Sequence, residues 1–284
     1  MALEACAIVG QIRFEEQQTV WTLDLEEEIA QSNYGIVYPG QMFHLAKERM
    51  EQTKLWKIVQ RMPKGALLHC HLEAMVDVDW LFHVALETDG MHITAPEVLH
   101  IASQRENVPF TFQYAKQSLQ AGASIWSKDY CPNTLVSLAD AAGTFPGGKE
   151  AFIKWLTSRC TVGIEESVNH HHGANAIWRK FTSVFAILKT LIYYEPIYRK
   201  FLAQMFRQLL EDGVQYVDVR AAFFFQYRKE GCENPEEDYQ EMIRVFGEEI
   251  KKFQASEEGK SFWGARIIWT SIRSFSNRAI VESE

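Results

Sequence analysis

Two histidines separated by a single residue, His69 and His71, have the side chains best suited to chemistry in this sequence. They end a short apolar run, 66–71, which Pro63 and Gly65 introduce and which has the length of a buried strand. Because side chains alternate along a strand, both imidazoles are expected on the same side. Neutral imidazole binds zinc well, so the pair predicts two ligands of one metal ion.

The spacing of the two histidines leaves a second interpretation open. A zinc site usually has three or four ligands, and the alternative is a pair of hydrogen-bonded histidines near a strand end. Three consecutive histidines, His170, His171 and His172, form another apparent cluster. They lie in a connection rich in Gly and Asn, which favours a solvated loop over a metal site.

The elements that must position His69 and His71 alternate in type along the chain. Apolar runs predict further strands at 214–223 and 264–273, the second followed by a helix that begins near Ser276 or Asn277. Helical spacing predicts the helices 41–60, 77–86, 149–158, 174–191, 196–211 and 236–254. Gly213 is expected to end the helix 196–211, and Asn234 with Pro235 to cap the helix 236–254.

This order of strands and helices is typical of a parallel α/β sheet. In such folds the carboxyl ends of the strands carry the reactive groups, which is where the two histidines are predicted.

Composition limits the classes of function. A chain of 284 residues with 47% apolar residues can bury the core of one large domain. A net charge of -8 with scattered Lys and Arg argues against nucleic acid and membrane partners and favours a small-molecule substrate. Five cysteines without zinc-finger spacing favour a reducing compartment. With no signal-peptide pattern and no apolar run near the roughly 20 residues of a membrane span, we expect a cytoplasmic protein.

Three stretches, in the same order, resemble one known family. Residues 62–80, MPKGALLHCHLEAMVDVDW, are similar to the opening motif of the adenosine deaminase-related growth factors, the adenosine deaminase 2-like group of the adenosine/AMP deaminase superfamily. Residues 177–201 with 214–223, and then 264–283, are similar to later helices and strands of that family. Three ordered segments are far more specific than a histidine pair alone.

The resemblance implies an α/β fold, the N-terminal part of a TIM (β/α)8 barrel with about three barrel strands. Residues 1–61 would form an N-terminal helical extension, and 62–284 a partial metal-dependent hydrolase domain with an insertion at about 90–175. The family places a third histidine ligand, an acidic glutamate and an aspartate pair on later strands, in HxGE and SxDDP segments that this sequence lacks. We therefore expect a truncated chain that is inactive alone.

The implied activity is zinc-dependent hydrolytic deamination of adenosine or deoxyadenosine. His69 and His71 carry over as zinc ligands, and zinc-activated water would add to C6 of the purine while an acid protonates the ring. Glu73 falls where the HxHLDG form of the motif has an aspartate that touches the ribose; a loop carboxylate near a helix start is the alternative. Trp178 matches a tryptophan over the substrate pocket, with a core tryptophan as the alternative.

Other interpretations concern partners and location. Arg220 and Arg273 end the second and third strands, where they would shape the barrel mouth or form structural ion pairs. The non-enzymatic alternative is a growth-factor-like binding protein that forms a homodimer through its N-terminal helices. A different metallohydrolase that shares only the histidine pair is a third interpretation. Members of the family are often secreted, so secretion is the alternative to the cytoplasm.

Overall fold

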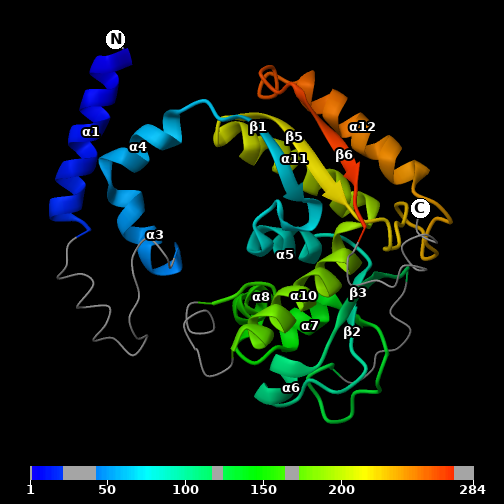
Figure 1. The fold of residues 1–284 in the computed structure, drawn as a ribbon. Coiled ribbons are helices and arrows are strands. Elements are labelled where there is room, and N and C mark those ends of the chain that lie inside the picture. The colour runs from blue at the N-terminus through cyan, green and yellow to red at the C-terminus, as the bar shows by residue number, and fades with distance from the viewer. Residues whose placement is uncertain (1, 22–42, 117–123, 164–172, 272–284) are drawn as a thin grey trace. The chain divides into compact units, whose positions relative to one another are not determined.

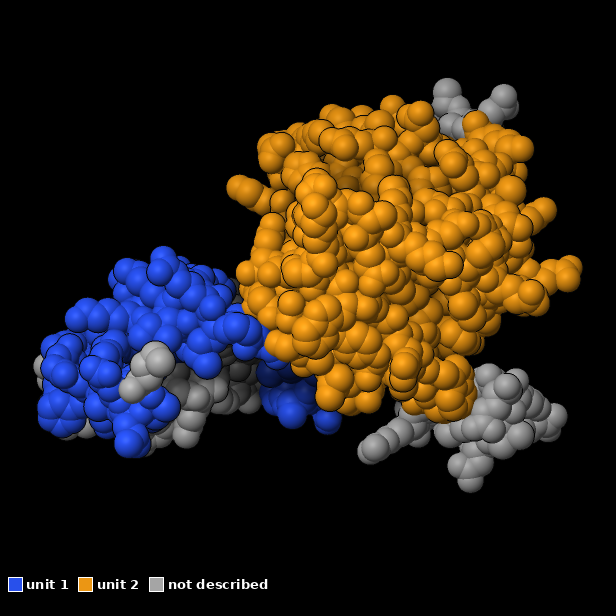
Figure 2. Space-filling model, turned by 90° about the horizontal axis from the view of Figure 1, so that it is seen from above, with its two compact units in different colours: residues 1–64, 162–178 blue, residues 65–161, 179–284 orange. Residues whose placement is uncertain are grey.

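The computed structural model describes residues 2–21, 43–116, 124–163 and 173–271. Contacts divide the chain into two compact units, which Figure 2 colours separately. Unit 1 comprises Met1–Lys64 and Val162–Trp178, and unit 2 comprises Gly65–Thr161 and Arg179–Glu284. Within the described ranges, no helix is long and apolar enough to cross a membrane.

The helices of unit 1 that precede the first strand are α1 (Ala2–Thr19), α3 (Phe43–Gln52) and α4 (Lys54–Arg61). The prediction of a single helix at 41–60 is wrong, because the helix is interrupted at Thr53. The Thr53 hydroxyl accepts a hydrogen bond from the Trp56 amide (3.0 Å) and donates one to the Met50 carbonyl (2.7 Å). Thr53 is therefore the N-cap of α4, a position that a short hydroxyl side chain favours over continued helix.

α1 contributes a second cap to the same helix. The buried carboxylate of Glu16 accepts hydrogen bonds through Oε1 from the amides of Lys54 (2.7 Å) and Leu55 (3.1 Å). These amides begin α4 and lack partners within the helix, so an acceptor with negative charge stabilises them.

Unit 2 contains the parallel sheet that the sequence predicts. Its strands are β1 (Gly65–His71), β5 (Val214–Ala221) and β6 (Gly264–Trp269), in the order β1-β5-β6. Both pairs of neighbours are parallel, and Figure 1 shows the three strands side by side. Arg273 and the helix predicted from Ser276 or Asn277 lie outside the described residues.

Helices cover one face of this sheet. α11 (Glu195–Glu211) packs against β5, and α12 (Gln240–Gln254) packs against both α11 and β6 (Figure 1). The alternate residues Val217, Val219 and Ala221 of β5 are fully buried. The residues between them are only partly buried, so the side chains of β5 separate into an apolar, helix-covered face and a polar face, here called the open face.

The end of α11 and the start of α12 can be compared with the helix-terminating and helix-capping residues that the sequence predicts. Gly213 adopts φ 78° directly after α11 and donates its amide hydrogen bond to the Leu210 carbonyl (2.9 Å), as predicted for a helix end. The predicted start of α12 near Glu236 is wrong, because the helix begins at Gln240. The Glu236 amide instead donates to the Tyr227 carbonyl (2.8 Å), which keeps the Asn-Pro segment in a loop.

The predicted insertion carries its own small sheet. Strands β2 (Met91–Thr94), β3 (Thr111–Tyr114) and β4 (Val136–Ser137) pair antiparallel in the order β3-β2-β4. Helices in the same segment are α6 (Ala102–Asn107), α7 (Leu138–Thr144) and α8 (Gly148–Arg159). Trp126 connects two of these helices: its ring contacts Phe152 and Trp155 of α8 edge to face, and its Nε1 donates a hydrogen bond to the Ala141 carbonyl of α7 (2.8 Å).

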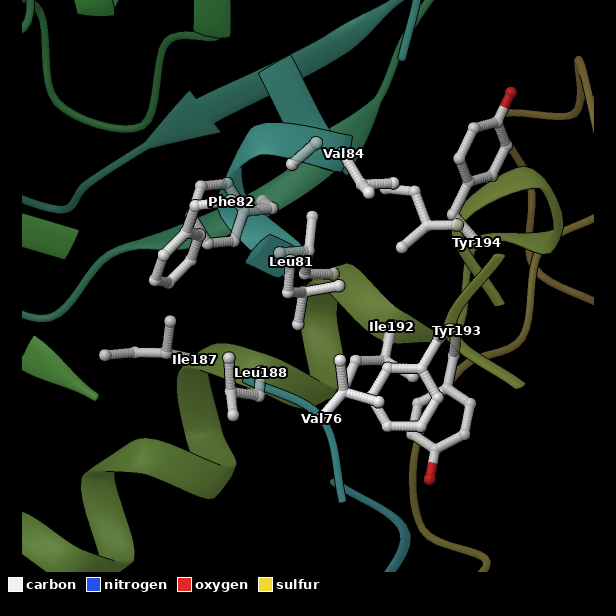
Figure 3. Packing of buried hydrophobic residues seen from close by; sticks show 14 of the residues in the cluster. Val76, Leu81, Phe82, Val84, Ile187, Leu188, Ile192, Tyr193 and Tyr194 are labelled. Atoms are coloured by element: carbon white, nitrogen blue, oxygen red, sulfur yellow. The ribbon is translucent and has the colours of Figure 1, made fainter. Parts of the chain in front are cut away.

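The chain after β1 is anchored by an apolar core. A short 3-10 turn (Leu72–Ala74) leads into α5 (Val78–Leu86), whose first amides are capped by Asp77. In Figure 3, Leu81 of α5 faces Leu188 and Ile192 of α10 (Gly173–Ile192), and all three are buried. This packing fixes the carboxyl end of β1, where the two histidines lie.

Candidate functional site

His69 and His71 lie side by side at the carboxyl end of β1. Their ring centroids are 5.8 Å apart with an interplanar angle of 52°, and both side chains are exposed. Two imidazoles on one tetrahedral zinc, with Zn–N bonds of about 2.0–2.1 Å, have ring centroids about 5 Å apart. The pair therefore fits two positions of a zinc site after a small rotation of either ring.

An aromatic side chain of α10 borders the pair. Phe185 contacts the His71 ring edge to face at 6.4 Å, and Phe181 contacts Phe185 in the same way at 5.2 Å. An apolar neighbour limits the rotation of His71 and lowers the local dielectric beside its ring.

Glu73 follows the histidines and is buried, with 8% of its surface exposed. The Tyr193 hydroxyl donates a hydrogen bond to Glu73 Oε1 at 2.8 Å. Tyr193 is itself buried and stacks on Phe225, with centroids 3.4 Å apart. Burial, together with the adjacent Glu73 carboxylate, raises the pKa of Tyr193 well above its usual value, so the tyrosine stays a hydrogen-bond donor at neutral pH.

Cys70 points away from the two histidines. Its side chain packs against the hydrophobic core, and its Sγ lies 3.5 Å from the Asp218 carbonyl. Burial raises the pKa of the Cys70 thiol to about 11, although Arg220 acts in the opposite direction. Thiolates are the form that binds metal, so the structure favours the histidines over Cys70 as ligands.

The open face of β5 presents polar groups beside the histidines. Tyr216 donates a hydrogen bond to Asp218 Oδ1 at 2.8 Å, and Asp218 lies opposite Arg266 of β6 in the strand register. Arg220 lies opposite His71 and donates a hydrogen bond to the Leu68 carbonyl at 2.9 Å. The Arg220 side chain is thus hydrogen-bonded to the backbone of β1.

Trp178 belongs to unit 1, whereas the histidines and Glu73 belong to unit 2; the Trp178 indole is 63% exposed. His170, His171, His172 and Arg273 lie outside the described residues. Among the residues that the structure describes, no group of three or more His, Cys, Asp and Glu side chains is arranged to hold a metal ion.

Tyr193 is the residue that the sequence did not single out. It is 120 positions from Glu73 along the chain, so no local spacing predicts the contact. The only available signal is the aromatic pair at 193–194, which directly follows the amphipathic helix α10.

Comparison with known proteins shows similarity to adenosine deaminases. The chain is 27% identical over 246 residues to adenosine deaminase 2-A of Danio rerio, which is 86% of this chain and 44% of that protein. It is 26% identical over 257 residues to adenosine deaminase 2 of Homo sapiens (90% and 46%). It is 26% identical over 235 residues to adenosine deaminase of Phlebotomus duboscqi (83% and 41%). No family model matches the chain.

These homologues confirm the resemblance to the adenosine deaminase and adenosine deaminase 2 group that the sequence motifs indicate. The chain spans less than half the length of each of these three relatives. Its fold is mixed α/β with a three-stranded parallel sheet, which is compatible with part of an α/β barrel.

Proposed function

We propose that this chain forms the N-terminal part of a zinc-dependent adenosine deaminase built on a (β/α)8 barrel. One observation carries the proposal: His69 and His71 lie on the same side of the carboxyl end of a parallel strand, 5.8 Å apart. Reactive groups in barrel enzymes occupy this end of the strands. The names of the homologues supply the reaction class, deamination of adenosine.

In this proposal His69 and His71 hold the zinc ion through their neutral imidazoles, and the family resemblance places the further ligands in later segments that this sequence lacks. A bound zinc ion would supply activation of water at neutral pH. Phe185 restricts the His71 ring, which reduces the reorganisation needed when the ion binds.

Glu73 is assigned to the nucleoside. Tyr193 occupies Oε1 of the carboxylate, and a carboxylate has about four acceptor positions, so Oε2 has capacity to accept a hydrogen bond from a ribose hydroxyl. Trp178 is assigned to stacking on the purine. The assignment rests on the match of Trp178 to the family's tryptophan over the substrate pocket, since an indole suits stacking on a purine.

The experiment is an adenosine-to-inosine assay on the polypeptide encoded by the native transcript, read through the codon for Glu284. Paired variants His69→Ala and His71→Ala should each abolish zinc-dependent activity, whereas His83→Ala, at a partly exposed position of α5, should retain it. The isolated 284-residue chain should show no activity, because two ligands without an acid do not accelerate the reaction. Activity that survives both histidine variants would refute the proposal.

A non-catalytic role in dimerisation is the second candidate, favoured by the apolar surface of α1. Leu3 and Phe14 are 88% and 65% exposed, and a spacing of 11 residues places them on the same side of the helix. Analytical ultracentrifugation of the chain and of a Leu3→Glu, Phe14→Glu variant tests this role. A dimer that the variant loses supports it, and a monomeric parent chain removes it.

A further inference from the structure

β1 contains one residue more than its partner strand in the segment that carries the first histidine. Leu67 lies opposite Val217, and Cys70 lies opposite Val219. Three residue steps on β1 therefore match two on β5. This is a β-bulge, an irregularity that is rare between parallel strands and that re-aims side chains next to active sites.

The extra residue changes which face the histidines occupy. Leu67 packs against the core, and strict alternation from it would send His69 and His71 to the same helix-covered face. In the structure Leu68 and His69 are exposed in succession, Cys70 packs against the core, and His71 is exposed. The bulge thus turns both imidazoles from the covered face to the open face.

Arg220 is bonded to the backbone within this irregular segment. Its Nη1 donates a hydrogen bond to the Leu68 carbonyl at 2.9 Å, and its backbone lies opposite His71. A bulged residue is displaced from the regular ladder of hydrogen bonds. The guanidinium, with five donors in a rigid fork, supplies a partner that a regular ladder would otherwise provide.

We propose that Arg220 is a positioning residue: through the Leu68 carbonyl it holds the bulge that presents His69 and His71 together on the open face. The bulge and its bond to Arg220 are properties of the metal-free chain. The effect of Arg220 on zinc binding rests on the proposed function, so the geometry and the zinc affinity are measured separately.

The geometric part is tested on the metal-free 284-residue chain by NMR or crystallography. Arg220→Met keeps the length of the side chain and removes its donors and charge. The expected result is that Cys70 no longer lies opposite Val219 and that the two imidazoles separate. Arg266→Met is the matched control, because it removes a guanidinium from the neighbouring strand of the same sheet. An Arg220→Met chain with the bulge and the histidine pair unchanged would overturn the proposal.

Zinc affinity distinguishes a positioning role of Arg220 from a simple effect of its charge. The two roles predict opposite changes in zinc affinity when the arginine is replaced. Removing a positive charge beside a cation site strengthens cation binding, so Arg266→Met should bind zinc as tightly as the parent chain or more tightly. Loss of a supporting residue weakens metal binding by roughly 10- to 100-fold, which is the result expected for Arg220→Met. Tighter binding by Arg220→Met would contradict positioning.

Two further outcomes are decisive. If the polypeptide encoded by the native transcript does not bind zinc, the proposed function fails, and the geometry of the metal-free variant still decides the role of Arg220. If Arg220→Met does not fold, the guanidinium of the parent chain is measured instead. Slow rotation of the Arg220 guanidinium, compared with Arg266, agrees with a fixed bond to Leu68, and equally fast rotation of both overturns the proposal.

Discussion

The Tyr193 hydroxyl donates a 2.8 Å hydrogen bond to the carboxylate of Glu73, two residues beyond the histidine pair. Both side chains are buried, and a carboxylate removed from water requires a donor. The contact joins the end of α10 to the turn that follows β1, so it connects the apolar core to the candidate site.

Tyr193→Phe should destabilise the chain, because the buried Glu73 loses its donor while the ring packing is kept. Hydrogen bonds to charged groups contribute about 1.5–3 kcal/mol, and we expect a loss of this size in urea unfolding. Tyr198→Phe is the matched control. The Tyr198 hydroxyl is buried and has no hydrogen-bond partner in the described part of the chain, so its removal should be neutral or stabilising. Equal losses in the two variants would contradict this role of Tyr193.

Stability should fall at alkaline pH. Burial raises the pKa of Tyr193 and of Tyr198 well above the usual value of 10. The unfolded chain releases these protons near pH 10 and the folded chain does not, so the stabilisation is complete below pH 10 and is lost as pH rises above it. The slope is about 1.4 kcal/mol per pH unit for each tyrosine. Denaturant unfolding between pH 9 and about 11 measures it, and Tyr198→Phe should remove one contribution.

Arg199 connects α11 to α12 and should be important for stability. It forms ion pairs with Glu195 (2.8 Å), Glu248 (3.1 Å) and Glu249 (2.8 Å), and the Glu249 side chain is only 4% exposed. Arg199→Met leaves the buried Glu249 carboxylate with only the largely exposed Lys252 as an ion-pair partner, at 3.5 Å. Removing one member of a buried pair costs up to about 3–5 kcal/mol. Combining Arg199→Met with Glu249→Gln should recover part of this loss in thermal unfolding. A single variant as stable as the parent would show that the pairing is unimportant.

The five cysteines should differ in reactivity toward a thiol reagent. Cys6, Cys131 and Cys232 are exposed, whereas burial raises the pKa of the Cys160 thiol to about 12 and that of Cys70 to about 11. The thiolate is the reactive form, so three thiols should react rapidly in the folded chain and all five after denaturation. Rapid reaction of Cys160 in the native chain would contradict its buried position.

The parallel sheet was predictable because its signals are local. β1, β5 and β6 are apolar runs that begin at or next to a glycine, and a run of this kind favours a buried strand. The strands of the insertion are four, four and two residues long. Such short segments carry too little periodicity to separate them from loops.

The candidate site was predictable only in part. Strand alternation predicts that His69 and His71 share a side, and their ring contact agrees. Alternation does not predict which side, because the bulge depends on pairing with β5, about 150 residues away along the chain. The contact between Glu73 and Tyr193 also joins residues far apart in sequence, 120 positions, so both features arise from tertiary packing.

The most direct test of the central claim is an NMR titration of the 284-residue chain with zinc, observing the imidazole signals. Shared coordination predicts that the His69 and His71 signals change together with a single affinity. The signals of His92 and His100, whose Nδ1 atoms are hydrogen-bonded to backbone carbonyls at 2.8 and 2.9 Å, should remain unchanged. If only one of the site histidines responds, or if they respond with different affinities, the two do not form one zinc site.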